Sequence, residues 1–241
     1  MIRIGTSGWS YDHWEDVLYP SGTPARARLD WYVGRFRTVE LNSSFYHWPR
    51  DSTFATWRER TPPGFALTIK APRGLTHSKR LYAPEAWIDR MARGLHHLGD
   101  RLGILLVQLP PAFEVNVARL EYFLEQLPPW LKVAVEFRHP SWNRDDVWTL
   151  LEHYGSAYCV MSGAGLPCIL RATAPVVYVR LHGPDEQHLY GGSYTEDSLR
   201  WWAERMQEWA GAGHEVWAYF NNDSGGNAVR NADTLAQLLS G

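Results

Sequence analysis

Residues 133–142 read Val133-Ala134-Val135-Glu136-Phe137-Arg138-His139-Pro140-Ser141-Trp142. The run begins with small and β-branched apolar residues, which is the composition of a strand buried on both faces. A glutamate, an arginine and a histidine follow, just before a proline stops the strand. Unpaired buried charge is costly, so we expect these side chains to pair or to face a cleft where the strand ends.

The same pattern of apolar run, polar end, loop and helix recurs along the chain. Eight strands are predicted, at Ile2–Gly5, Thr38–Leu41, Phe65–Lys70, Gly103–Gln108, Val133–Phe137, Ala157–Met161, Val176–Leu181 and Val216–Phe220. Apolar residues at helical spacing predict helices over Pro84–Leu98 and Asn116–Leu127. A further helix is predicted after Ser193-Tyr194-Thr195-Glu196, which resembles a capping box.

This alternation predicts an α/β fold, a single (β/α)8 TIM barrel that forms one domain over residues 1–241. A doubly wound open sheet is the alternative, but eight evenly spaced strands favour the barrel. The loops after the third and seventh strands, Ala71–Ala83 and His182–Tyr194, are long. Long loops in a compact domain are often functional.

The composition narrows the function classes. The chain of 241 residues carries a net charge of −2, so no overall basic field indicates nucleic-acid binding, and only a local basic patch would serve it. The chain is unusually aromatic, with 13 Trp and 12 Tyr. Aromatic residues usually pack in the core, and some of them line binding clefts.

The cysteines and the N-terminal residues indicate a protein of a reducing compartment. Cys159 and Cys168 match no metal-ligand or disulfide spacing, and we expect two buried or half-buried thiols in a reducing compartment. No stretch approaches the ~20 apolar residues of a membrane span. No signal peptide precedes Ile2. We therefore expect a cytoplasmic protein with no membrane contact.

The active sites of TIM barrels lie at the C-terminal ends of the strands. The side chains that follow or end the predicted strands are Thr6, Ser7, Trp9, Glu40, Asn42, Tyr46, Lys70, Gln108, Glu136, Arg138, Arg180, His182, Tyr219, Asn221, Asn222 and Asp223. Almost every strand delivers a polar or ionisable group, which favours a functional site over a bare scaffold. We expect six of them to converge at one end of the barrel: Glu40, Lys70, Glu136, Arg138, Arg180 and Asn221.

Each of these residues also has a structural interpretation. The glutamates, the arginines and Lys70 are equally compatible with an internal ion-pair network. The loop histidines are expected to be hydrogen-bonded rather than catalytic: His13, His47, His77 and His139. Helix packing is expected for Trp87, Trp202 and Trp209. A cleft-lining role is more plausible for the aromatic residues that follow strands, which are Trp9, Trp14, Tyr46, Trp48 and Trp142.

A glycine-containing loop leads from the last predicted strand into the last helix. It reads Asn221-Asn222-Asp223-Ser224-Gly225-Gly226. Backbone amides at a helix N-terminus bind anions, and TIM barrels often hold phosphate there. The alternative is an ordinary turn in which Asp223 or Ser224 caps the helix.

Several motifs, taken together and in order, resemble one family. They are Gly5-Thr6-Ser7-Gly8-Trp9 with Trp14 and Tyr19-Pro20, Val39-Glu40-Leu41-Asn42 with Phe45-Tyr46, Lys70-Ala71 with Thr76-His77, Gln108-Leu109-Pro110-Pro111, Glu136-Phe137-Arg138-His139, Arg180-Leu181-His182-Gly183 and Tyr219-Phe220-Asn221-Asn222. The set resembles the YecE-like family, also called domain of unknown function 72. The resemblance implies a TIM barrel, loosely similar to the endonuclease IV and xylose isomerase group, without an established activity.

The first functional hypothesis is a hydrolase or lyase that acts on a phosphate-bearing, sugar-like or nucleic-acid substrate. Glu136, Glu40 and His182 are the candidate acid–base residues. Lys70, Arg138 and Arg180 would hold an anionic group. The other expected binding residues are Trp9, Asn42, Tyr46, Gln108, Tyr219, Asn221, Asn222 and Asp223. A retaining glycosidase with Glu40 and Glu136 as its carboxylate pair ranks lower.

Two alternatives remain open. One is a barrel that binds nucleic acid or a phosphorylated metabolite without turning it over. The other is a metal-dependent, endonuclease-like enzyme, which needs clustered His, Asp and Glu ligands. Lys70 and Gln108 stand at the ends of the third and fourth strands, and a lysine repels a cation. We therefore expect no metal and no cofactor.

Overall fold

The computed structural model describes residues 1–240, and eight strands run through them. They are β1 (Ile2–Thr6), β2 (Thr38–Leu41), β3 (Ala66–Lys70), β4 (Leu102–Gln108), β5 (Val133–Glu136), β6 (Ala157–Ser162), β7 (Val176–Leu181) and β8 (Glu215–Phe220). Each predicted strand is confirmed, with ends that differ by at most one residue. Their side chains are almost all buried, which is why the runs are apolar without alternation.

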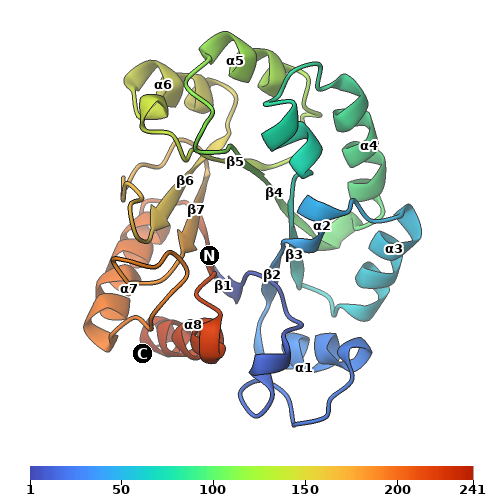
Figure 1. The fold of residues 1–241 in the computed structure, drawn as a ribbon, viewed down its shortest axis with the longest axis vertical. Helices are drawn as coiled ribbons and strands as arrows, with labels where there is room; N and C mark the ends of the chain where they lie inside the picture. Colours follow the sequence, from blue (N-terminus) through green and yellow to red (C-terminus); the bar gives the residue numbers. More distant parts are fainter. Residues whose placement is uncertain (241) are drawn as a thin grey trace. The chain divides into compact units, whose positions relative to one another are not determined.

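Helices separate the strands. They are α1 (Arg28–Arg35), α2 (Ser43–Tyr46), α3 (Asp51–Arg60), α4 (Glu85–His96), α5 (Val117–Glu125), α6 (Asp145–His153), α7 (Glu196–Gly211) and α8 (Asn227–Ser240). The helices predicted from apolar spacing correspond to α4, α5 and α7. The strands are parallel, with the sheet order β1-β8-β7-β6-β5-β4-β3-β2. This is the predicted (β/α)8 fold of a TIM barrel, and Figure 1 shows its elements in chain order.

Residue contacts divide the chain into two compact units. Unit 1 comprises Met1–Glu40, Val160–Leu170 and Pro175–Gly241, and unit 2 comprises Leu41–Cys159 and Arg171–Ala174. Each unit is described by itself below. The single-domain organisation stays a prediction.

Unit 1 is built on β1, β7 and β8. Thr6 pairs with Phe220 across β1 and β8, and Arg180 pairs with Tyr219 across β7 and β8. Helices α7 and α8 pack together and contact β1 and β8 (Figure 1). β1 needs Gly5, because a Cβ there would lie 2.2 Å from the carbonyl oxygen of Thr38.

Unit 2 contains β3, β4, β5 and the first part of β6, with α2 to α6 around them. Lys70 on β3 pairs with Leu106 on β4, and Gln108 on β4 pairs with Glu136 on β5. The register continues past the strands, because Leu109 N donates to the Glu136 carbonyl at 2.8 Å. The carboxyl ends of three neighbouring strands therefore present Lys70, Gln108 and Glu136 together.

The start of α7 differs from the sequence prediction. The capping-box prediction makes Ser193 the cap, but the cap is Thr195, whose Oγ1 accepts a hydrogen bond from Ser198 N at 3.2 Å. Asn231 explains the difference. Its Nδ2 donates to Ser193 Oγ at 3.1 Å, and its Oδ1 accepts from Tyr194 N at 3.1 Å. Ser193 is therefore engaged by α8 rather than by its own helix.

Three further residues depart from the prediction. Trp14 and Trp142 are fully buried core residues rather than cleft-lining ones. Trp142 stacks on Phe137 with ring centroids 4.8 Å apart, and its indole N–H donates to the Phe113 carbonyl at 2.6 Å. Cys159 is buried as expected, but Cys168 is exposed because it lies between β6 and β7, outside regular structure.

Among residues 1–240, no helix combines the length and the apolar character that crossing a membrane requires.

Candidate functional site at the strand ends

Glu40 is the centre of a buried polar cluster in unit 1, here called the Glu40 cluster, with Ser7, Tyr178 and Arg180. Arg180 forms a bidentate pair with Glu40, from Nε to Oε2 at 2.9 Å and from Nη2 to Oε1 at 2.7 Å. Ser7 Oγ donates to Oε1 at 2.6 Å, and the Tyr178 hydroxyl donates to Oε2 at 2.5 Å. All four residues are at most 1% exposed.

The chemistry of this cluster is that of a satisfied ion pair. Each Glu40 oxygen accepts two hydrogen bonds, which uses the lone pairs that a general base needs. Burial, and then the charge of Glu40, raise the pKa of Tyr178 well above its ordinary value, so the phenol stays a neutral donor. The geometry favours the ion-pair interpretation for Glu40 and Arg180. Their catalytic and substrate-binding roles stay predictions.

His182 follows β7 and is buried. Its Nδ1 lies 3.2 Å from Asn221 Nδ2, and Asn221 follows β8. An amide nitrogen can only donate, so Nδ1 accepts and the proton of a neutral imidazole sits on Nε2. The ring also contacts Tyr190, with centroids 5.3 Å apart. The structure thus brings His182 and Asn221 together. They follow β7 and β8, two neighbouring strands whose ends were expected to lie close to each other.

Two other predicted binding residues in unit 1, Tyr219 and Asn222, form hydrogen bonds within the protein. The Tyr219 hydroxyl lies 2.7 Å from Thr38 Oγ1, and Tyr219 is buried. Asn222 Nδ2 donates to the Gly192 carbonyl at 3.0 Å and to Asn231 Oδ1 at 2.9 Å. Asn222 therefore holds the loop after β7 against α8. Trp9 is half-buried.

The loop before α8 holds an acidic side chain and contacts basic ones, because Arg230 Nη1 donates to the Gly225 carbonyl at 2.5 Å. Asp223 lies in it, and burial raises the pKa of this carboxyl above its ordinary value. His13 Nε2 lies 2.8 Å from the Asp223 carbonyl and 3.7 Å from its carboxylate. Ser224–Gly226 forms a short 3-10 helix, so neither Asp223 nor Ser224 caps α8 directly. The anion site expected here stays a prediction.

Glu136 is the centre of a second cluster, in unit 2, here called the Glu136 cluster, with Lys70, Gln108 and Arg138. Gln108 Nε2 donates to Glu136 Oε1 at 2.7 Å, and Arg138 Nε donates to the same oxygen. Oε2 lies 3.9 Å from the Cys159 thiol. Glu136 is fully buried, and the Arg138 side chain is 7% exposed. Lys70 Nζ lies 4.3 Å from the centroid of the Phe45 ring.

His77 reports the electrostatics of the Glu136 cluster. Its pKa falls from 6.5 to about 4, first because of burial and then because of the charges of Lys70 and Arg73. Arg138 lowers this pKa further, and Glu136 raises it. The field at His77 is therefore net positive, and the imidazole is neutral at pH 7. Its ring packs edge-on against Phe45 at 4.9 Å, and Nδ1 lies 3.0 Å from Thr76 Oγ1.

His77 was expected to be a hydrogen-bonded loop residue, and Phe45 was not expected at the site. The signal for His77 was the long loop after the third strand, because His77 lies inside it. Residues 74–78 form a π-helix, η3 (Gly74–Ser78). Arg80, Leu81 and Ala83 follow with φ of 48°, 65° and 44°, a conformation that non-glycine residues rarely adopt. π-Helices and strained backbone concentrate at functional sites.

Two predicted binding residues, Asn42 and Tyr46, lie in the segment after β2, which contacts β3 of the Glu136 cluster. Asn42 follows β2, and its buried Oδ1 has no hydrogen-bond partner among residues 1–240. Ser44, two residues later, donates from Oγ to the Lys70 carbonyl at 2.8 Å, which ties this segment to β3. Tyr46 is 69% exposed and packs edge-on against Phe45, with centroids 5.0 Å apart. The exposed Tyr46 ring is thus accessible to a ligand, whereas the unused Asn42 acceptor is buried.

The described part of the chain, residues 1–240, holds no group of three or more His, Cys, Asp or Glu side chains arranged to bind a metal ion.

Comparisons with known proteins identify relatives over the whole chain. A family model described as "Protein of unknown function DUF72" matches residues 3–241. The UPF0759 protein YunF of Bacillus subtilis (strain 168) is 30% identical over 275 residues, which cover 99% of this chain and 95% of YunF. The UPF0759 protein YecE of Escherichia coli (strain K12) is 30% identical over 142 residues, or 58% of this chain and 50% of YecE.

Solved structures match the fold. A DUF72 family protein from Thermotoga maritima MSB8 has a TM-score of 0.90 and 31% identity, with 100% of both chains covered. A DUF72 family protein from Enterococcus faecalis V583 has a TM-score of 0.87 and 22% identity, which covers 100% of this chain and 96% of the other. The first similarity extends to sequence, and the second concerns the fold alone.

Proposed function

We propose, for a chain that belongs to the family described as protein of unknown function DUF72, that the Glu136 cluster binds a phosphate-bearing substrate and that the protein is a hydrolase or lyase. The substrate class includes sugar phosphates and nucleotides, which share the anionic group that the cluster would recognise.

The lowered pKa of His77 carries this proposal. It falls to about 4 first because of burial, and then because the charges of Lys70, Arg73 and Arg138 outweigh the single negative charge of Glu136. A partly buried site with excess positive charge gains free energy when an anion enters. Lys70 and Arg138 lie at the carboxyl ends of β3 and β5, where ligands of this fold class bind.

Each residue then has a chemical role. Lys70 and Arg138 hold the phosphate and offset negative charge that develops during reaction. Glu136 transfers the proton, because the lone pairs of the other buried glutamate, Glu40, are already used. Neutral His77 offers a hydrogen bond to the substrate. The exposed Tyr46 ring is suited to stack on a sugar or base.

A second candidate function is a binding module without turnover. The ion pair between Arg138 and Glu136 favours it, because a carboxylate held by a guanidinium is a weaker base. The two candidates make the same prediction for affinity and opposite predictions for chemistry.

Calorimetry with inorganic phosphate and a nucleoside monophosphate tests the binding step. We expect Lys70→Met to weaken binding roughly tenfold and Lys70→Arg to restore it in part. Arg200→Gln is the charge-matched control, because Arg200 pairs with Glu196 on the exposed face of α7. Phosphate should also raise the pKa of His77 in an NMR titration of its ring protons. Absence of binding, or binding unchanged in Lys70→Met, contradicts the proposal.

Glu136→Gln separates the enzyme from the binding module. Glutamine keeps the shape of the side chain and loses the proton-accepting carboxylate. Ligands are first found by thermal shift with sugar phosphates, nucleotides and oligonucleotides, and their turnover is then followed by phosphorus NMR. We expect Glu136→Gln to keep affinity and lose turnover. Affinity without turnover in the unsubstituted protein selects the binding module.

A further inference from the structure

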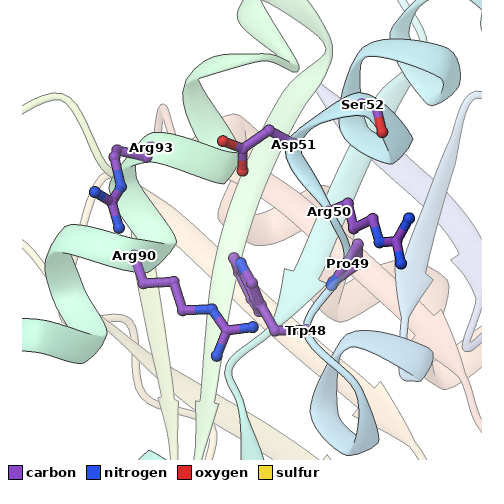
Figure 2. Close-up of a pocket in the computed structure, with 7 residues that line it drawn as sticks. All are labelled: Trp48, Pro49, Arg50, Asp51, Ser52, Arg90 and Arg93. Carbon is purple, nitrogen blue, oxygen red and sulfur yellow. The ribbon is translucent and has the colours of Figure 1, made fainter.

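A pocket of about 590 Å³ lies in unit 2 between the start of α3 and one face of α4. Its lining includes Trp48, Arg50, Asp51, Ser52, Arg90 and Arg93. Figure 2 shows Arg90 and Arg93 extending from α4 on one side of Trp48, with Arg50 on the other side. A volume of this size falls within the ~300–1,000 Å³ of small-molecule sites.

The three arginines of this pocket have no side-chain partner among residues 1–240: Arg50, Arg90 and Arg93 form no hydrogen bond, ion pair or ring contact there. The one lining carboxylate, Asp51, lies 3.8 Å from His97 Nε2. The lining of the pocket therefore carries three guanidinium groups and one carboxylate, on a chain whose net charge is −2. The positive charge is local to this pocket and is not part of a generally basic surface.

Two of these arginines are neighbours on the surface of α4. Arg90 and Arg93 stand three residues apart on α4, and like charges at this spacing repel one another. An anion between the two guanidinium groups would remove the repulsion and would use donors that the protein leaves unused. Each planar guanidinium can meet two oxygens of one phosphate group.

Trp48 supplies the pocket with a fixed aromatic ring. It packs against Phe54 of α3, with centroids 5.3 Å apart and planes at 51°. Its Nε1 is buried and would lie 3.2 Å from a Cβ placed on Gly94, so that edge of the indole faces α4. The ring is half-buried and lines the pocket with its remaining surface. A flat apolar group can pack there beside the arginines.

We infer that this pocket binds a nucleotide, with its phosphates on Arg90 and Arg93 and its base against Trp48. Arginine forks recognise phosphate, and an indole recognises the π-face of any base. The site is separate from the Glu136 cluster, which shares none of these lining residues, so it stands or falls independently of the proposed function.

Calorimetry with ATP, tripolyphosphate and adenosine, without divalent cations and at about 150 mM salt, tests this inference. We expect ATP to bind and Arg90→Gln/Arg93→Gln to weaken it roughly tenfold or more. Arg200→Gln is the control for a lost exposed charge, and Lys70→Met is the control for the Glu136 cluster. Trp48→Leu should weaken ATP but leave tripolyphosphate unchanged. Trp48→Phe keeps a ring if the leucine variant fails to fold.

Four results would overturn the inference. They are no binding of ATP to the unsubstituted protein, ATP binding unchanged in Arg90→Gln/Arg93→Gln, ATP binding lost in Lys70→Met instead, and ATP binding unchanged in both Trp48 variants. Binding of a single-stranded oligonucleotide in the absence of ATP binding would also overturn it, because the site would then recognise a polymer backbone.

Discussion

Glu40 and Glu136 are both fully buried, yet their surroundings differ. Glu40 is held by a bidentate arginine, a tyrosine and a serine, so its charge is compensated and fixed in place. Glu136 sits among cations that outnumber it, beside a histidine whose pKa they lower. The partners of a carboxylate decide whether it stabilises the fold or takes part in chemistry.

Glu40→Gln tests the structural task. The substitution leaves Arg180 buried without its counter-charge, and we expect the free energy of unfolding to fall by about 3 kcal/mol or more. Glu40→Gln/Arg180→Met should recover part of the loss. Urea unfolding measures both. The exposed pair of Arg200 and Glu196 provides the comparison, and Arg200→Gln should change stability by less than about 1 kcal/mol. A similar small loss in Glu40→Gln would refute the compensated-pair interpretation.

His77 should make stability depend on pH. Its pKa falls from 6.5 to about 4 on folding, so between these values the unfolded chain binds the proton more readily. Stability is therefore lost as the pH falls through this window and is unaffected by His77 above it. We expect His77→Asn to lose less stability than the unsubstituted protein between pH 6.5 and pH 4. Thermal unfolding across this range measures the difference, with exposed His47→Asn as control.

At the scale of the elements, strands were the most predictable parts of this chain. Continuous apolar runs such as Ile104–Val107 in β4 favour a strand covered on both faces. The start of α7 was less predictable, because its cap depends on a contact of Ser193 with Asn231, 38 residues away. The strained loop after β3 was also unpredictable, since its φ values are imposed by surrounding packing.

Gly5 and Gly34 form a matched pair for testing element packing. A Cβ at Gly5 would lie 2.2 Å from the Thr38 carbonyl oxygen, whereas one at Gly34 in α1 would meet nothing within 4 Å. We expect Gly5→Ala to destabilise by about 2 kcal/mol or more. Gly34→Ala should stabilise α1 by about 0.5 kcal/mol, because alanine loses less backbone entropy. Denaturant titration of both variants measures this. Equal effects would contradict the tight approach of β1 to Thr38.

At the scale of the whole molecule, the fold class followed from eight strand–helix alternations. The candidate site followed only in part. The rule that strand ends carry the site found Glu136, Lys70 and Gln108, which a shared register brings together. It could not show that Glu40 is enclosed by Arg180 and Tyr178, because that depends on side-chain geometry. The convergence of the six named residues, from five strands, at one end stays a prediction.

The whole chain should unfold in one transition. Two of the four boundaries between the compact units fall inside strands, between Glu40 and Leu41 in β2 and between Cys159 and Val160 in β6. A boundary inside a strand is not a flexible linker, so we expect the single domain predicted from sequence. Far-ultraviolet circular dichroism and tryptophan fluorescence should give coincident denaturation curves. Two separated midpoints would show that the units unfold independently.

The two free cysteines differ in exposure, so their reactivity can report transient opening of the folded protein. Cys168 is exposed, whereas Cys159 is enclosed in β6. A thiol reagent should therefore modify one group at once and the second only when the sheet breaks open. Mass spectrometry would count the adducts on each molecule as a function of time, without denaturant. The slow modification of Cys159 would then give the rate at which the native state opens.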